Sequence, residues 1–264
     1  MSDSAAAKIL IERRDAVTVI TINRPEVRNA VDRAVMDGLR DALTTCADDG
    51  TRCVVLTGAG GAFSSGADLK QLARDGFSAD TTFALLTDSF GPTLKALRGF
   101  PYPVIAAVDG YAAGIGCDLA LACDLRLVSA RGRFAELFVR IGLIPDGGGT
   151  YLLPRLVGIG RALEMILTGE DVDAEEALRI GLANKIYPVE SFMPDTLAYA
   201  DRLSRQAPGS LRRSKAALLA ALDSTYDESL AREAAWQHEI LSSDDGREGF
   251  QAFLEKRAPR WTGQ

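Results

Sequence analysis

The stretch VIAAVDGYAAGIGCDLALACDLRLVS, residues 104–129, decides the fold class. It opens on five apolar residues, Val104–Val108, which are too few for a helix and suit a buried strand. Three glycines then lead into a helical run that reaches Ala122. A second short stretch, Leu125–Ser129, predicts the next strand. A strand, a helix and a strand in this order are typical of an α/β protein with crossover connections.

The same alternation extends toward the N-terminus. Asp32 can cap a helix that runs to about Ala47. Apolar residues spaced by three and four predict a further helix over Thr82–Leu97. Short apolar runs predict three strands, at Ile9–Arg13, Val17–Ile22 and Cys53–Thr57.

Strand signals stop after about residue 155, where the sequence predicts helices only. We therefore expect an α/β core with the active site over residues 1–195, and a helical oligomerisation region over residues 196–264. The predicted helices of the second half are Gly160–Thr168, Ala174–Ile180, Ser191–Arg205, Ser210–Leu222, Glu228–Leu241 and Gly246–Lys256.

The composition excludes several classes of function. Of the 264 residues, 30 are basic and 36 acidic, which gives a net charge of −6. Nucleic acid is therefore not expected as a partner, because binding to its phosphates requires a basic face. No apolar run approaches the roughly 18 residues that span a bilayer. Met1–Lys8 also lacks the apolar core of a secretory signal, so we expect neither membrane attachment nor secretion.

The histidine and cysteine content narrows the chemistry further. The single histidine, His238, lies in a predicted helix near the C-terminus, where a surface position is expected. Catalysis by a Ser-His-Asp or Cys-His group is thereby disfavoured, and no metal site is expected. The four cysteines form no Cys-x-x-Cys pair, which indicates reduced, buried thiols in a cytoplasmic protein.

Three glycine-rich segments adjoin predicted strands or helices: GAGGAFSSGADL (58–69), GYAAGIGCD (110–118) and GLIPDGGGT (142–150). The first lacks the lysine of a phosphate-binding loop and the third glycine of a dinucleotide fingerprint. No Gly-x-Ser-x-Gly elbow occurs either. Each segment alone is compatible with a tight turn. Together they predict backbone N–H groups that face a ligand, since glycines before a helix leave such donors free.

Two such N–H groups from separate loops would form an oxyanion hole. A nearby carboxylate could then move a proton at a carbon atom that the hole makes acidic, without a histidine. At these residues the chain resembles the crotonase superfamily of enoyl-CoA hydratases and isomerases, nearly from end to end. The segments that carry the resemblance are NRP (23–25), RNA (28–30), FSSGADL (63–69), DGYAAG (109–114), IGLIP (141–145), LTG (167–169), ALRIG (177–181) and EGF (248–250), continuing to Arg257.

The resemblance implies the crotonase spiral of ββα units with a C-terminal helical trimerisation region, and trimers that often pair into hexamers. The substrate would be an acyl-CoA thioester, so coenzyme A enters as part of the substrate and no cofactor is bound covalently. The N–H groups of Ala67 and Ile115 match the family's oxyanion hole, with isoleucine where the family usually has glycine. The residues that match coenzyme A contacts are Arg28, Ala30, Ala67, Asp68 and Leu69, with Phe253 and Lys256 reaching a neighbouring subunit's substrate.

The acids distinguish the subtypes of the family. Hydratases carry two glutamates, of which the first matches Asp118 and the second matches Phe138, a residue that cannot transfer a proton. Glu136 could substitute only if the alignment is shifted by two residues. Asp146 matches an aspartate of dienoyl-CoA isomerases and of the ring-opening isomerases of phenylacetate breakdown. The latter also share Gly-Leu-Ile-Pro-Asp and the Leu-Leu-Pro-Arg of residues 152–155, and are the type most similar to this chain.

Structural roles compete with these assignments. Asp118 could cap the helix after Gly116, and Asp146 could cap the helix that opens at Gly147. Asp124 is expected to be structural, as is the side chain of Asp68 at the start of its helix.

We therefore expect an acyl-CoA double-bond isomerase, in which Asp146 and Asp118 move a proton of the thioester enolate. The alternative is a 2-enoyl-CoA hydratase that uses Asp118 with a bound water. A thioesterase or dehalogenase with Asp146 as nucleophile, and a non-catalytic CoA- or RNA-binding relative, are weaker hypotheses. The residues predicted to line an apolar acyl pocket are Phe90, Ile115 and Phe138, with Leu85 and Leu86.

Overall fold

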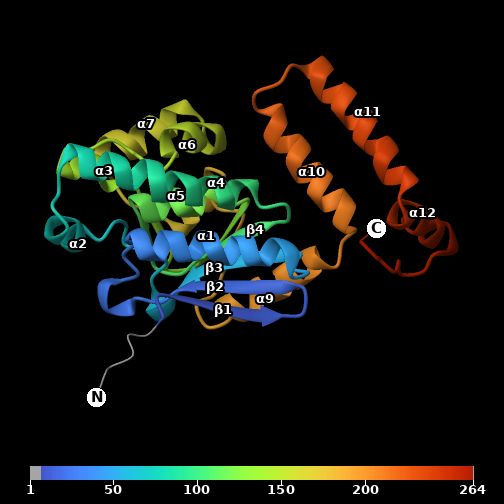
Figure 1. The fold of residues 1–264 in the computed structure, drawn as a ribbon, viewed down its shortest axis with the longest axis horizontal. Coiled ribbons are helices and arrows are strands. Elements are labelled where there is room, and N and C mark those ends of the chain that lie inside the picture. Colours follow the sequence, from blue (N-terminus) through green and yellow to red (C-terminus); the bar gives the residue numbers. More distant parts are fainter. Residues whose placement is uncertain (1–6, 264) are drawn as a thin grey trace.

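The computed structural model describes residues 7–263, so most of the N-terminal stretch Met1–Lys8, and with it the prediction about a secretory signal, lies outside the described residues. The chain forms an α/β fold, as predicted (Figure 1). A six-stranded sheet in the order β1-β2-β3-β4-β6-β9 lies at its centre. β1 and β2 pair antiparallel, and the other neighbours in this sheet pair parallel. The strands are β1 (Ile9–Arg14), β2 (Val17–Ile22), β3 (Cys53–Gly58), β4 (Val104–Val108), β6 (Leu125–Ser129) and β9 (Lys185–Tyr187).

The central strands are buried on both faces, which explains their continuous apolar sequence. Along β3, Val54 and Leu56 join the larger core, whereas Val55 faces the smaller core on the opposite side of the sheet. α1 packs in the larger core and α9 in the smaller one, so the two helices cover opposite faces of the sheet. The covering helices are α1 (Arg33–Asp48), α4 (Gly91–Gly99) and α5 (Ile115–Ala122) on one face, and α9 (Phe192–Ser204) on the other.

The predicted helix after Asp32 is confirmed, whereas the one predicted over Thr82–Leu97 is longer and interrupted. α3 (Ala79–Leu85) starts earlier than predicted, at a capping box formed by Ser78 and Thr81. A π-helical turn, η3 (Leu86–Phe90), then leads directly into α4. Apolar spacing could not reveal this turn, because tertiary hydrogen bonds hold it. One of them joins Ser89 Oγ to Asp37 Oδ1 at 2.8 Å.

A second sheet contains three short strands in the order β5 (Tyr111–Ala113), β7 (Arg133–Ala135) and β8 (Val172–Asp173). The prediction that strands stop after about residue 155 is wrong, since β8 and β9 follow that point. β7 is not predicted by the sequence pattern either. Strands of two or three residues show no alternation, and only their backbone pairing with a neighbour defines them. The remaining helices are η1 (Pro25–Val27), η2 (Ala59–Gly61), α2 (Leu69–Arg74), η4 (Leu137–Ile141), α6 (Gly149–Val157), α7 (Ile159–Thr168) and α8 (Ala174–Arg179).

The C-terminal arm, comprising α10 (Pro208–Ala221), α11 (Tyr226–Ser242) and α12 (Asp244–Glu255), extends away from the sheet (Figure 1). α10 and α11 lie side by side within it. The helices predicted for this region are confirmed to within a few residues. α9, which precedes the arm, packs on the sheet instead of extending away from it. The domain boundary at residue 195 stays a prediction. Large apolar side chains exposed on the arm are Leu218, Tyr226, Leu230, Phe250 and Phe253.

Candidate active site

Two of the glycine-rich loops meet edge to edge. Ser64 N–H donates to the Tyr111 carbonyl at 2.9 Å, and Ala113 N–H donates to the Ser64 carbonyl at 3.0 Å. A Cβ atom on Gly116 would lie 2.6 Å from the Ser64 carbonyl oxygen, too close for any other residue type. The chain therefore needs glycine here so that the backbones of the two loops can touch.

This contact brings the N–H groups of Ala67 and Ile115 to the same place in the fold. Gly114, at φ 52°, turns the chain so that Ile115 becomes the first residue of α5. An N–H at that position has no acceptor within its helix. Among residues 7–263, neither the Ala67 nor the Ile115 N–H donates a hydrogen bond. Two free donors on touching loops are what an oxyanion hole requires.

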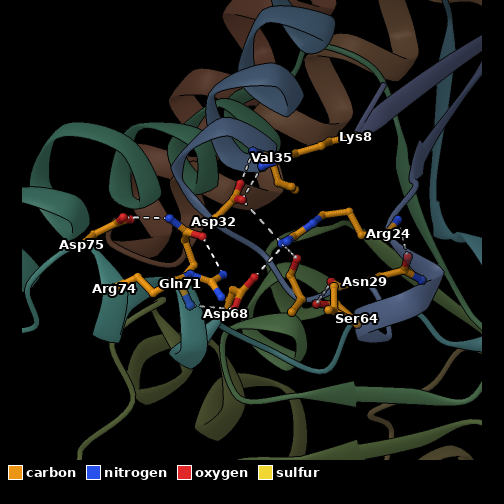
Figure 2. A network of polar contacts seen from close by, with 12 residues as sticks. Lys8, Arg24, Asn29, Asp32, Val35, Ser64, Asp68, Gln71, Arg74 and Asp75 are labelled. Atoms are coloured by element: carbon orange, nitrogen blue, oxygen red, sulfur yellow. Dashed lines mark hydrogen bonds and ion pairs between the residues drawn. The ribbon is translucent and has the colours of Figure 1, made fainter. Parts of the chain in front are cut away.

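A network of polar contacts fixes the loop that carries Ala67 (Figure 2). Arg24 donates to Asp68 Oδ2 at 2.8 Å and to the Ala30 carbonyl at 2.7 Å. Asn29, buried at φ 57°, donates to the Ala62 carbonyl at 2.7 Å and accepts from the Arg24 N–H at 2.9 Å. The sequence pattern gives Arg24 and Asn29 no role, because the partners that hold the Ala67 loop lie 30 to 44 positions later.

Asp68 has the structural role that was predicted for its side chain. It caps α2 by accepting from the Gln71 N–H at 2.9 Å, and it pairs with Arg24. Burial raises the pKa of the Asp68 carboxyl, but the hydrogen bonds from Gln71 and Arg24 outweigh this and leave it below its ordinary value. The carboxylate is therefore ionised, and it ties α2 to the loop before α1.

Asp118 is completely buried in the first turn of α5. Its Oδ2 accepts from the Gly147 N–H at 3.1 Å, while its Oδ1 has no hydrogen-bond partner in the described residues. Burial, and then the charges of Glu136 and Asp146, raise the pKa of Asp118 well above its ordinary value. The protonated form of Asp118 is thereby favoured. Asp118 does not cap its own helix, since Gly114 is the N-cap of α5 and no side chain caps it, so the capping alternative is wrong.

Asp146 lies half-buried in the loop directly before Gly147, the residue that donates to Asp118. Burial raises the pKa of Asp146 to about 6, so most of it is ionised at pH 7. The capping alternative is wrong for this residue as well. α6 begins at Gly149, with Gly148 as its N-cap and no side-chain cap. The Asp146 carboxyl is therefore not engaged as a helix cap.

Phe138 and Glu136 lie close to the loops that carry Ile115 and Asp118. Phe138 belongs to η4, and Glu136 lies between β7 and η4. Phe138 is 7% exposed, and its ring lies 3.9 Å from the position that a Cβ on Gly114 would take. Glu136 directly follows β7 and is completely buried. Sequence analysis gave Glu136 a role only under a shifted alignment. Recognition of β7 in the sequence would have indicated that Glu136 is buried. Residues two positions apart in a strand lie on the same face, which places Glu136 on the side of Phe134.

The other predicted contacts are spread over the molecule. Arg28 and Leu69 are exposed near the two loops, and Ala30 is buried beneath them. Phe90 lies in the main core. Phe253 and Lys256 lie on and just after α12, at the far end of the arm from α2 (Figure 1). Within one chain these two residues therefore do not reach the Ala67 loop.

Several further residues have roles outside the site. Asp124 accepts from the Val104 N–H at 2.7 Å and from Lys215 at 2.6 Å, so its predicted structural role is confirmed. His238 is exposed on α11. The cysteines are buried free thiols, as predicted. Within residues 7–263, no group of three histidine, cysteine or acidic side chains could hold a metal ion, and no helix is long and apolar enough to cross a membrane.

Comparison with known proteins places this site in a family. Residues 12–264 match the enoyl-CoA hydratase/isomerase family. The chain belongs to this family. A protein of Rhodobacter capsulatus named probable enoyl-CoA hydratase is 43% identical over 97% of this chain and 98% of its own length. The 2,3-dehydroadipyl-CoA hydratase of Escherichia coli is 34% identical over 98% of this chain and 100% of its own.

Solved structures agree with the assignment of fold and family. The crystal structure of an enoyl-CoA hydratase from Bacillus anthracis has a TM-score of 0.93 and 33% identity, and covers 97% of this chain and 100% of its own. The crotonase fold is therefore confirmed, with its helices at the C-terminus. Because these relatives are named hydratases, the predicted likeness to the isomerase type is not confirmed. An acyl-CoA thioester is consistent with the family as substrate, without a covalent cofactor.

Proposed function

We propose that this member of the family hydrates a 2-enoyl-CoA thioester. The observation that carries the proposal is a pair of neighbouring aspartates in unlike surroundings: Asp118 is completely buried and Asp146 is half-buried. Burial raises the pKa of Asp118 well above its ordinary value and so favours its protonated form, whereas Asp146, with a pKa of about 6, is mostly ionised at pH 7. Hydration needs one group that gives a proton and one that takes a proton. Relatives named 2,3-dehydroadipyl-CoA hydratase and crotonyl-CoA hydratase support this choice over isomerisation.

The residues divide the reaction between them. The thioester oxygen accepts from the N–H groups of Ala67 and Ile115, which stabilise the enolate as negative charge develops. Asp146 takes a proton from water as the water oxygen bonds to C3 of the substrate. The electron pair of the C2–C3 double bond moves toward the thioester, and Asp118 gives its proton to C2. Each oxyanion donor is worth roughly 3 kcal/mol of barrier.

Double-bond isomerisation is a second candidate, and Phe138 favours it. Phe138 packs beside Gly114 where the family's hydratases have their second glutamate, and it cannot activate water. In this alternative, Asp146 removes a γ or α proton, and the same residue or Asp118 returns one to a different carbon. No water is added, so the product has the mass of the substrate.

The acyl group and coenzyme A would lie on opposite sides of the hole. Ile115, Phe138 and Phe90 are buried apolar side chains of the main core, and we propose that they border the acyl group, which suits an apolar acyl chain or ring. Arg28, Ala30, Ala67, Asp68 and Leu69 would contact coenzyme A from one subunit, with Phe253 and Lys256 from a neighbour. Because Phe253 and Lys256 lie far from the Ala67 loop of their own chain, this arrangement requires a neighbouring subunit. We propose a homotrimer or a hexamer built from two trimers, which the resemblance to the crotonase superfamily implies. We propose the cytoplasm as its location, since the cysteines are free thiols.

Mass spectrometry of product mixtures tests the proposal. The purified enzyme is incubated with a panel of 2-enoyl-CoA and 3-enoyl-CoA thioesters of increasing acyl length. A product heavier than its substrate by one water supports hydration. A product of unchanged mass but altered retention supports isomerisation instead. Substrates that all stay unchanged at both pH 6 and pH 8 would refute both activities.

A further inference from the structure

Glu136 is a buried carboxyl group without a partner. Its side chain is completely shielded from solvent, and neither of its carboxyl oxygens makes a hydrogen bond within residues 7–263. An ionised carboxylate in such surroundings is costly, because it has lost its hydration without compensation. Buried acids that serve the fold are normally paired, as Asp124 is with Lys215 at 2.6 Å. The fold alone therefore gives no reason for a carboxyl group at residue 136.

Glu136 borders the same small space as the catalytic acid. A methyl group on Gly149 would lie 2.5 Å from Asp118 Oδ1 and 3.2 Å from Glu136 Oε1. Both of these oxygens lack a hydrogen-bond partner in the described residues. The other titratable groups that face the pair are Cys117 on α5 and Asp146 on the loop before α6. The two carboxyl groups thus have only each other, a thiol and a third acid nearby.

We propose that Glu136, in its protonated form, is a positioning residue that shares its proton with Asp118 once Asp118 has given its own to the substrate. The inference rests on the proposed function, in which Asp118 is the acid. Two carboxylates in one apolar space cannot both carry charge at reasonable cost. If Glu136 were ionised, proton donation by Asp118 would create such a pair. If Glu136 is neutral, proton donation by Asp118 leaves the two carboxyl groups with one negative charge and one proton between them. This state costs less free energy than two buried charges.

The protons balance over a turnover. Water gives its hydroxyl to C3 of the substrate and one proton to Asp146. Asp118 gives its proton to C2 and then holds a negative charge jointly with Glu136. The proton on Asp146 returns to the Asp118–Glu136 pair, which restores the starting state of all three groups. Proximity permits this return, since the charge of Asp146 acts on the titration of both partners.

Burial supplies the required protonation state. It raises the pKa of Glu136 to about 7, and the neighbouring Cys117 thiol offsets part of this effect although it makes no regular hydrogen bond to the carboxyl group. Glu136 is therefore neutral below about pH 7 and charged above it. Activity should then need Asp146 ionised and Glu136 protonated, which predicts a bell-shaped profile of kcat/KM.

The test compares two substitutions of Glu136 across the pH range. Wild-type kcat/KM should fall about tenfold per pH unit above about pH 7, where Glu136 loses its proton. Glu136→Gln keeps a hydrogen-bond donor at every pH, so its alkaline limb near pH 7 should disappear and it should exceed wild type at pH 9. Glu136→Leu offers no donor and should be slow throughout. Glu175→Gln, the same chemical change on the exposed surface of α8, is the matched control and should reproduce the wild-type profile.

Infrared titration of the substrate-free enzyme gives a second readout. Beside the band of protonated Asp118, the wild type should show a protonated-carboxyl component that disappears with a midpoint near pH 7, and Glu136→Gln should lack this component. An alkaline limb at the same pH in wild type and Glu136→Gln, or a component with that midpoint that persists in Glu136→Gln, would overturn the inference. Failure of the proposed function looks different: no enoyl-CoA is converted by the wild type, while the infrared band still reports whether Glu136 holds its proton.

Discussion

At the scale of single residues, the proposed chemistry depends on two aspartates that differ in their affinity for a proton. Asp118 and Asp146 differ in burial, and burial is the largest cause of the rise in the pKa of each. Sequence comparison can align two aspartates with those of relatives, but it cannot show which one carries a proton. That difference arises from the loop of Gly147, which packs Asp118 away from water and leaves Asp146 half-exposed.

The first prediction concerns Asp146 as the base. Asp146→Asn keeps the size of the side chain and removes its ability to accept a proton, so kcat should fall about 10²–10⁴-fold. KM should change little, because the N–H groups of Ala67 and Ile115 remain in place. Steady-state kinetics with the best substrate of the panel measures both values. Full turnover by Asp146→Asn would remove this residue from the mechanism.

The second prediction follows from the burial of Glu136. Its pKa rises from 4.5 to about 7 on folding, so the folded state holds this proton more tightly than the unfolded state does. The free energy of unfolding should therefore be highest below about pH 4.5 with respect to this group and should decline as pH rises to about 7. The decline is on the order of 3 kcal/mol. Glu136→Gln should lose this component, as urea unfolding at pH 5 and pH 8 would show.

At the scale of secondary-structure elements, the loop that carries Ala67 is held from outside its own segment. Arg24 links the turn before α1 to the N-terminus of α2 through Asp68, and both side chains are nearly buried. Asp68, the residue next to Ala67, thus both caps α2 and forms the ion pair with Arg24. The geometry of the proposed oxyanion hole depends on this contact between two elements.

The third prediction tests that dependence. Arg24→Met keeps the length of the side chain but leaves the Asp68 carboxylate buried and unpaired, which should destabilise the protein by on the order of 3 kcal/mol. It should also lower kcat more than it raises KM, since the Ala67 N–H would lose its fixed position. Arg179→Met breaks an exposed ion pair with Glu176 and is the control for loss of charge alone. Equal effects of the two substitutions on thermal unfolding would contradict the assigned role of Arg24.

The elements also show how far sequence patterns reach. Long apolar runs such as Val104–Val108 and capped helices such as α1 were predicted correctly, because local composition decides them. β7, β8, β9 and the π turn at Leu86–Phe90 were not, because pairing or hydrogen bonds with distant segments define them. The burial of Glu136 could not be predicted for the same reason, because Glu136 directly follows β7, one of these short strands.

At the scale of the whole molecule, the C-terminal arm exposes apolar side chains that no other part of the described chain covers. Its helices stand apart from the sheet (Figure 1). They expose large apolar side chains, among them Phe253 at 79% and Tyr226 at 77%. Exposed apolar surface of this extent marks an interaction site. The prediction that the arm contacts neighbouring subunits is one use for this surface, and Phe253 is the residue predicted to link assembly to coenzyme A binding.

The fourth prediction separates assembly from folding. A substitution at an exposed position seldom changes the stability of a monomer, so Phe253→Asp should leave the thermal unfolding of isolated subunits nearly unchanged. If Phe253 lies between subunits beside coenzyme A, the substitution should instead reduce the mass measured by light scattering or raise KM for the thioester about tenfold or more, as expected when a central apolar contact is lost. Phe83→Asp, at a position 69% exposed on α3, is the matched control. A Phe253→Asp protein with the mass and the KM of the wild type would place the intersubunit contact to coenzyme A elsewhere.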